Sequence, residues 1–263
     1  MINSKQRALI AKDLRFAKET KGNIASIIIV SLVFCVVIPS VIIIAMHFNP
    51  DGMNELDGLL ALLGDMFGEI DTNMVLLSFL LNNIIPLFFL MIPVIATTTM
   101  ATSSFIGEKE KRTLETLLYS PISLRQIFSS KVLAAFFLSM IVTVTAFILY
   151  LAVSQVLMHF LFGQFILPGI NWFLIVLVIA PVISLLAVTI TCKISAKAQT
   201  MEEAFQKAGL LTIPIILFAA SQVTGLMIIS TWVLLGVGIV IGIVAYVLMQ
   251  SALRSFKYET LLK

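Results

Sequence analysis

Charged side chains are scarce in this sequence: they make up 12% of its 263 residues, whereas hydrophobic residues make up 60%. In a soluble globular chain about one quarter of the residues are charged. The mean hydropathy is +1.09, and the apolar residues form continuous runs instead of the alternation of a membrane β-barrel. The composition therefore excludes a soluble chain and predicts an all-α integral membrane protein with one helical membrane domain.

Histidine and cysteine are also rare, with two of each. His47 and His159 stand far apart, so the H-E-x-x-H helix of a zinc intramembrane protease is excluded. Cys35 lies in the middle of one apolar run and Cys192 at the end of another, where both are typical of small packing residues and not of a disulfide. We therefore predict no catalytic group, no metal site and no nucleic-acid partner for this chain.

No Asp, Glu, Lys or Arg falls at the core of any long apolar run. This weighs against an ion-coupled pump, because such pumps generally need buried ionisable groups. The sequence also lacks a G-x-x-x-x-G-K-[ST] loop, so the chain does not cradle a nucleotide phosphate by that route. If ATP drives this protein, a separate polypeptide binds the ATP, and we expect no cofactor on this chain.

What the sequence does contain is six apolar runs, each able to cross a hydrocarbon core of about 30 Å. They are residues 24–46, 74–104, 132–157, 172–192, 208–229 and 232–251. Pro86 and Pro93 in the second run each remove a helix hydrogen bond, so we expect a kink or break there. Residues 24–251 are therefore predicted to form a six-span transmembrane domain.

Residues 1–23 are too polar to cross a membrane. At helical spacing Leu9, Ile10 and Leu14 gather on one arc, and most of the lysines and arginines occupy the other. This pattern predicts a cytoplasmic amphipathic helix in the membrane interface, with its basic face toward anionic headgroups or a partner. A secretory signal is the alternative, but no small-residue cleavage site follows the apolar run. Residues 252–263 are predicted to form a basic cytoplasmic tail.

The basic residues divide the chain into two faces. All 17 lysines and arginines lie in the N-terminal segment, in residues 105–131, in residues 193–207 or in the tail. The other face has none, and six acids gather there between residues 51 and 71. The positive-inside rule therefore predicts a multi-pass protein of the cytoplasmic membrane with both termini in the cytoplasm. Trp172 and Trp232 then begin their spans at the outer face, where aromatic rings prefer to sit.

Polar and proline residues in the second run are candidates for a substrate path: Asn82, Asn83, Pro86 and Pro93. The two asparagines equally suit hydrogen bonds to a neighbouring helix near the kink.

Two further patterns are open to two interpretations each. Gly238 and Gly242 form a G-x-x-x-G motif, which suits close helix packing within one subunit or a dimer seam. The acidic region 47–73 suggests either a cation site or a solvated face that enforces topology. Its acids do not keep the spacing of a calcium-binding loop.

Residues 105–131 form the one long charged segment between two strongly apolar runs. Five charged residues follow one another over 108–112, and Leu114, Leu117 and Leu118 then recur at i, i+3 and i+4. On a helix this spacing makes one apolar ridge. The pattern predicts a short amphipathic helix of a kind that binds a partner protein.

A sharp corner follows this helix. Ser120 precedes Pro121, and the residue before a proline is pushed out of the α region. Ser123 with Gln126 three residues later forms a capping box, which predicts a new helix into the membrane.

This segment resembles the signature of ABC type-2 exporter permeases, in which an E-[KR]-E-x-x-T-L-E-x-L-L-x-S-P-[IV]-S run joins the second and third of six spans. The matching residues are Glu108, Lys109, Glu110, Thr113, Leu114, Glu115, Leu117, Leu118, Ser120, Pro121, Ile122 and Ser123, with Lys131 opening the third span. This chain has Arg112 where the family often has glycine. Size, span number and the basic N-terminal helix agree as well.

The resemblance implies a membrane subunit that works as a dimer, either with a second copy or with a sister permease, and that docks two separate ATPase subunits carrying ATP and Mg²⁺. Residues 107–122 would be the coupling helix seated in a groove on the ATPase. The implied contacts are Glu108, Lys109, Glu110, Arg112, Thr113, Leu114, Glu115, Leu117, Leu118, Ser120 and Pro121.

The wholly apolar spans favour export of an amphipathic or hydrophobic substrate such as a peptide antibiotic, a drug or a lipid-like molecule. Sodium or other ion efflux by the same family is one alternative. A non-transporting membrane immunity or sensor protein is the alternative from another class.

Overall fold

The computed structural model describes residues 4–19, 21–49, 72–110, 123–198, 200–223 and 230–255. Every regular element in these ranges is a helix. Six stretches are long and apolar enough to cross a membrane: Ile24–Phe48, Asn73–Gly107, Arg125–Phe162, Ile170–Ser195, Met201–Gln222 and Thr231–Ala252. The predicted number of spans is therefore confirmed.

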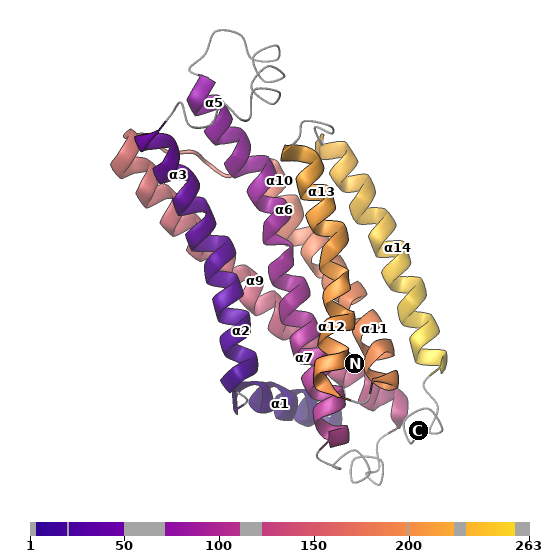
Figure 1. The fold of residues 1–263 in the computed structure, drawn as a ribbon. Helices are drawn as coiled ribbons and strands as arrows, with labels where there is room; N and C mark the ends of the chain where they lie inside the picture. Colours follow the sequence, from indigo (N-terminus) through magenta and orange to yellow (C-terminus); the bar gives the residue numbers. More distant parts are fainter. Residues whose placement is uncertain are drawn as a thin grey trace.

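The six spans run alternately up and down as one bundle (Figure 1). The first is built from α2 (Lys21–Leu32), a π-helical turn (Val33–Val37) and α3 (Ile38–Phe48), and the second from α5 (Thr72–Phe79), a π-helical turn (Leu80–Ile84), α6 (Ile85–Phe89) and α7 (Met91–Glu110). The third is α9 (Leu124–Phe162), and the fourth is α10 (Ile170–Leu174), a π-helical turn (Ile175–Ile179) and α11 (Ala180–Lys197). The fifth is α12 (Met201–Gly209), a 3₁₀ turn (Leu210–Thr212) and α13 (Ile213–Val223), and the sixth is α14 (Thr231–Ser255).

A separate helix, α1 (Ser4–Glu19), lies across one end of the bundle (Figure 1). We call this the α1 end; α7, α11 and α14 finish there and α9 begins there. The opposite end, where α10 and α14 begin, is called the α10 end. The predicted N-terminal helix is therefore present, and its place at a membrane interface stays a prediction.

The second span forms the centre of the bundle. Its most apolar stretch is 61% buried, whereas the corresponding stretches of the other five spans are 17–44% buried. In its last part, α7 packs against both α9 and α11. The second span is therefore the most buried of the six candidate spans.

The predicted capping box starts the third span. Ser123 Oγ accepts a hydrogen bond from the Gln126 backbone N–H at 3.4 Å, and Gln126 Oε1 accepts one from the Ser123 N–H at 3.2 Å. The helix continues for 39 residues and ends at Gly163, whose φ of 66° is the left-handed conformation that favours glycine.

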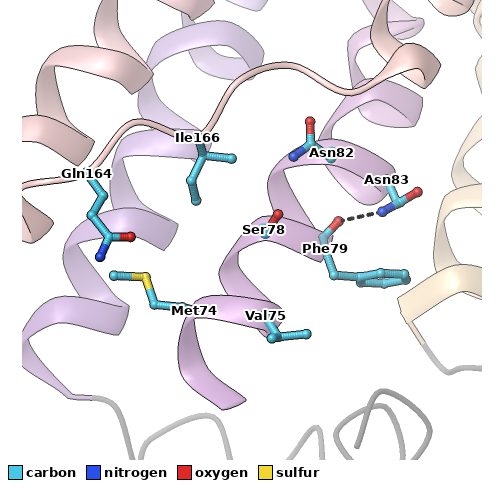
Figure 2. Close-up of a pocket in the computed structure, with 8 residues that line it drawn as sticks. All are labelled: Met74, Val75, Ser78, Phe79, Asn82, Asn83, Gln164 and Ile166. Carbon is cyan, nitrogen blue, oxygen red and sulfur yellow. Dashed lines mark hydrogen bonds between the residues drawn. The ribbon is translucent and has the colours of Figure 1, made fainter. Parts of the chain in front are cut away.

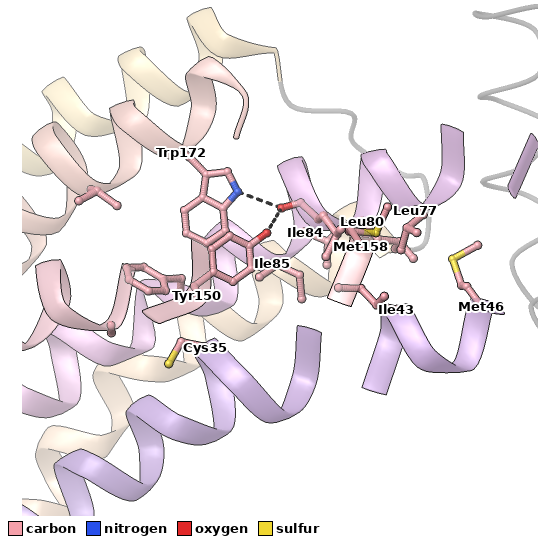
Figure 3. Close-up of a cluster of buried hydrophobic side chains, with 14 of the residues drawn as sticks. Cys35, Ile43, Met46, Leu77, Leu80, Ile84, Ile85, Tyr150, Met158 and Trp172 are labelled. Carbon is pink, nitrogen blue, oxygen red and sulfur yellow. Dashed lines mark hydrogen bonds between the residues drawn. The ribbon is translucent and has the colours of Figure 1, made fainter. Parts of the chain in front are cut away.

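The predicted break in the second span is also present, and it has a specific consequence. In the π-helical turn the Ile85 N–H bonds to the Leu80 carbonyl, five residues back. The next carbonyl, that of Leu81, would bond to residue 86, but Pro86 has no N–H. Trp172 Nε1 donates to the Leu81 carbonyl at 2.9 Å and Tyr150 Oη donates to it at 3.2 Å, as Figure 3 shows. Two aromatic side chains from other spans thus replace the missing backbone donor.

This arrangement corrects one expectation about the tryptophans. Trp172 is fully buried and stacks on Tyr150 with ring centroids 4.3 Å apart, so it is a core residue and not an interface anchor. The buried position of the indole is favoured because its N–H supplies a donor to the buried Leu81 carbonyl. Trp232, by contrast, is 81% exposed.

The fifth span begins earlier than the predicted residue 208. Thr200 Oγ1 accepts a hydrogen bond from the Glu203 N–H and caps α12, which begins at Met201. This charged stretch forms a helix because its buried side holds Ala204 and Ala208, while its charged residues lie on the other side. Gly238 and Gly242 of α14 face the fourth span of the same chain. A Cβ added at them would lie 3.4 Å from Ile179 and 3.6 Å from Val182, which supports packing within one subunit.

We predict that Tyr150→Phe lowers the free energy of unfolding by about 1 kcal/mol, because the Leu81 carbonyl keeps its bond from Trp172. In a Trp172→Phe background the same change should cost more, about 1–3 kcal/mol, because the buried carbonyl then has no donor. Unfolding of the detergent-solubilised protein measures both values, with Tyr246→Phe on the exposed face of α14 as the control. Equal costs in the two backgrounds would show that the two rings do not share this acceptor.

Candidate functional site

The segment with the family signature lies mostly outside the described residues. This applies to Arg112, Thr113, Leu114, Glu115, Leu117, Leu118, Ser120 and Pro121. Glu108, Lys109 and Glu110 are described only as the last backbone turn of α7. Their roles in coupling stay a prediction. The helices before and after this segment, α7 and α9, are described, and they pack against each other.

An apolar cluster holds those two helix ends together. Phe105 of α7 and Phe128 of α9 are both buried, with ring centroids 6.1 Å apart. Val132 of α9 and Val188 and Cys192 of α11 belong to the same cluster. The segment between α7 and α9 is therefore mounted on a packed base.

A buried lysine lies in this base. Lys131 of α9 is 1% exposed, and its Nζ donates to the Ser104 carbonyl at 2.6 Å and to Ser104 Oγ at 2.8 Å. The same Nζ lies 5.2 Å from the centroid of the Phe105 ring. A lysine so removed from water requires hydrogen-bond acceptors and an opposite charge.

The opposite charge comes from α1. Asp13 is 3% exposed, and its Oδ2 accepts from Ser104 Oγ at 3.1 Å and lies 3.9 Å from Lys131 Nζ. We call these three residues the Asp13–Ser104–Lys131 cluster. It joins α1, α7 and α9 around one buried ion pair, directly beside the ends of the signature segment.

Apolar contacts and one further hydrogen bond hold α1 in the same place. Leu9 is buried, Ile10 and Leu14 pack against the cluster that contains Phe128, and Gln6 Nε2 donates to Ser129 Oγ at 3.1 Å. Sequence reasoning missed Asp13. The signal was its position four residues after Leu9, in the middle of the apolar arc, where a charge needs a partner.

The substrate-path candidates lie along the second span, with Asn82, Asn83 and Pro86 in its half toward the α10 end and Pro93 near its middle. Asn82 and Asn83 line a cavity of about 370 Å³ between the second span and the link from α9 to α10 (Figure 2). The other lining residues are Met74, Val75, Ser78, Phe79, Gln164 and Ile166. The lining named here is uncharged and amphipathic. Pro86 and Pro93 are buried and are not among these residues.

The two asparagines also hold neighbouring spans, as the second interpretation proposed. Asn82 Oδ1 accepts from the Gly169 N–H at 2.7 Å, and Asn83 Oδ1 accepts from Asn171 Nδ2 at 3.0 Å. Asn171 Oδ1 in turn accepts from Thr231 Oγ1 at 3.0 Å. These bonds connect the second, fourth and sixth spans, as the second interpretation expects, and a role of the asparagines in a substrate path stays a prediction.

Within the described part of the chain, no group of three or more His, Cys, Asp or Glu side chains is placed to hold a metal ion. The acidic region between residues 51 and 71 lies outside that part.

We predict that Lys131→Met lowers the free energy of unfolding by about 3–5 kcal/mol, because it removes the cation that lies beside the buried Asp13 carboxylate. The matched control is Lys207→Met. Lys207 forms an exposed i, i+4 pair with Glu203 at 2.6 Å, the two side chains being 52% and 37% exposed, so its loss should change stability by less than about 1 kcal/mol. Similar effects of the two substitutions in a detergent unfolding assay would contradict the buried pairing.

Comparison with known proteins identifies the chain's family. The family model for the ABC-2 type transporter matches residues 58–221, which is more than half of the chain and includes the signature segment and the cavity. Searches of curated proteins and of solved structures gave no match. With its six apolar helices, the chain is a multi-pass membrane protein and the permease component of an ABC transporter, which implies a partner ATPase. This chain belongs to the ABC-2 type transporter family.

Proposed function

We propose that this permease exports an amphipathic or hydrophobic substrate, such as a peptide antibiotic, a drug or a lipid-like molecule, across the cytoplasmic membrane. A separate subunit hydrolyses the ATP, and that subunit holds the nucleotide and Mg²⁺. The observation that carries the proposal is the packing of α7 against α9, the two helices that residues 107–122 connect. The helices on either side of this segment meet in one buried cluster at the α1 end, so a force on the segment reaches two spans at once.

In this proposal the α1 end faces the cytoplasm, together with both termini. The basic residues whose side chains are described support this orientation, because they lie on elements at the α1 end: Arg7, Lys12, Arg15, Arg125, Lys131, Lys193 and Lys207. Lysine and arginine are retained on the cytoplasmic side of short-looped membrane proteins. The ATPase then approaches from the side on which ATP is available.

Coupling would begin at the ridge of Leu114, Leu117 and Leu118. An apolar ridge supplies most of the affinity for a groove on the ATPase, and the charged residues over 108–112 set its register. Closure of the ATPase pair then moves α7 and α9. Because α7 lies in the middle of the bundle, its movement changes the packing around the second span.

The cavity beside Asn82 supports the substrate class. Four of its eight lining side chains are uncharged polar groups and four are apolar. Such a lining suits a neutral amphipathic molecule better than a bare ion, which needs several converging oxygen ligands. A second permease, either a copy of this chain or a sister chain, would complete the translocation path.

We predict that Leu114→Asp combined with Leu118→Asp weakens binding of the cognate ATPase at least about tenfold, because each carboxylate would be desolvated in an apolar groove. Binding to the purified permease and stimulation of ATP hydrolysis both report the effect. Gln206→Asp, an exposed residue of α12 at the same end, is the control. Unchanged binding and hydrolysis in the leucine variant would show that the ridge is not the docking element.

A second prediction concerns the substrate. Cells that express the permease with its ATPase should tolerate a higher concentration of uncharged amphipathic peptide antibiotics or dyes, and Ser78→Trp, which fills the cavity, should remove this tolerance. Ile148→Trp, at a position of α9 that is 61% exposed, adds the same bulk outside the cavity and should have no effect. Tolerance to sodium alone, unaffected by Ser78→Trp, would contradict the proposed substrate class.

A further inference from the structure

We propose that a small enclosed chamber beside the link between α9 and α10 binds one ordered water molecule. The water joins the side-chain amide of Gln155 in the third span to that of Asn82 in the second. The chamber has a volume of about 10 Å³, which is about the space that a single buried water needs. The site belongs to the permease itself, so neither the ATPase nor transport enters the argument.

Gln155 brings a buried acceptor to the wall of this chamber. Its Nε2 donates to the Ile166 carbonyl of the link, and the opposite orientation of the amide would place two acceptor oxygens against each other. The other end of the amide, Oε1, is therefore an oxygen. This atom is buried, and no described residue donates a hydrogen bond to it. A buried acceptor without a donor is strongly unfavourable, and an ordered water is the usual donor in such a place.

Three further polar side chains on the wall complete the coordination of the water. Asn82 Oδ1 accepts from the Gly169 N–H at 2.7 Å, so Nδ2 is the end of this amide that donates to the water. The hydroxyls of Tyr150 and Ser154 donate to backbone carbonyls at 3.2 and 3.4 Å, and their oxygens can accept. The water donates to Gln155 Oε1 and to one hydroxyl and accepts from Asn82 Nδ2, which gives the three bonds that are typical of a buried water.

The water is part of a larger arrangement that holds the link in place. Residues 164–169 are not helical, so their backbone groups need partners outside the link. Gln155 supplies a donor to Ile166, and Asn82 supplies an acceptor to Gly169. The water joins the other ends of these two amides. The second span, the third span and the link are thereby connected as one hydrogen-bonded unit.

This unit also forms a wall of the larger cavity. Asn82 and Ile166 line both the chamber and the cavity of about 370 Å³ that Figure 2 shows. The water keeps the Asn82 amide bonded at both of its ends and so fixes the position of this wall. Loss of the water frees the amide on one side and loosens the wall.

Radiolysis of the purified permease in lipid nanodiscs by synchrotron X-rays tests the site, because hydroxyl radicals formed from a bound water oxidise a methionine beside it. Met158 lines the chamber and is 0% exposed. Met46 belongs to the same apolar cluster, is 3% exposed and is not among the residues that line the chamber. We expect radiolysis to oxidise Met158 at least about threefold faster than Met46. Chloramine T, a bulk oxidant too large for the chamber, should oxidise Met158 no faster than Met46.

Two variants remove the water in different ways. Gln155→Leu removes the buried acceptor, whereas Ser154→Val fills the chamber and leaves Gln155 in place. Each should lower the radiolytic oxidation of Met158 at least about threefold. Gln164→Leu is the matched control, because it makes the same change at an exposed residue that lines only the larger cavity. It should leave the oxidation of Met158 unchanged.

Three results would overturn the water site. In the first, radiolysis of the parent protein oxidises Met158 no faster than Met46. In the second, the oxidation of Met158 is unchanged or raised in either variant, which would show that the radicals do not come from a water in the chamber. In the third, chloramine T oxidises Met158 faster than Met46, which would show that the chamber is open to bulk water. None of these results bears on the proposed function, because transport is not measured.

Discussion

Lys131 carries a charge where almost no water reaches it, and the arrangement of the α1 end follows from what that charge requires. The Ser104 oxygens bind the ammonium group, and the Asp13 carboxylate neutralises it from a third helix. A lone lysine in this place would be strongly unfavourable, so the ion pair favours the association of α1, α7 and α9. The segment that we propose as the ATPase contact leaves the bundle from this set and returns to it.

A similar requirement shapes the other half of the second span. Pro86 leaves the Leu81 carbonyl without a backbone donor, and the buried side chains of Tyr150 and Trp172 supply two. Asn82 and Asn83, in the same π-helical turn, bind the start of the fourth span through Gly169 and Asn171. The second span therefore has polar contacts in both of its halves. The amphipathic cavity lies beside the contacts of Asn82 and Asn83, which face the outside in the proposed orientation. This is a physical route by which a movement at α7 could change the cavity.

The features that the sequence predicted well depend on local chemistry. Continuous apolar runs define the six spans, a serine and a glutamine three residues apart define the start of α9, and a proline defines the break in the second span. The features that were missed depend on tertiary partners. Trp172 looked like an interface anchor because nothing local reveals that the Leu81 carbonyl needs its N–H, and the Asp13 partnership requires two helices to meet. The fifth span was placed too late because a polar first turn resembles a loop until its buried alanines are known.

The account depends most on the claim that residues 107–122 contact the ATPase, and site-specific photocrosslinking in living cells tests it most directly. A photoreactive amino acid is placed at Leu118 in one strain and at Gln206, at the same end of the bundle, in another. The account predicts a crosslink from position 118 to the cognate ATPase that strengthens when ATP is trapped. An efficient crosslink from position 206 together with none from position 118 would contradict it.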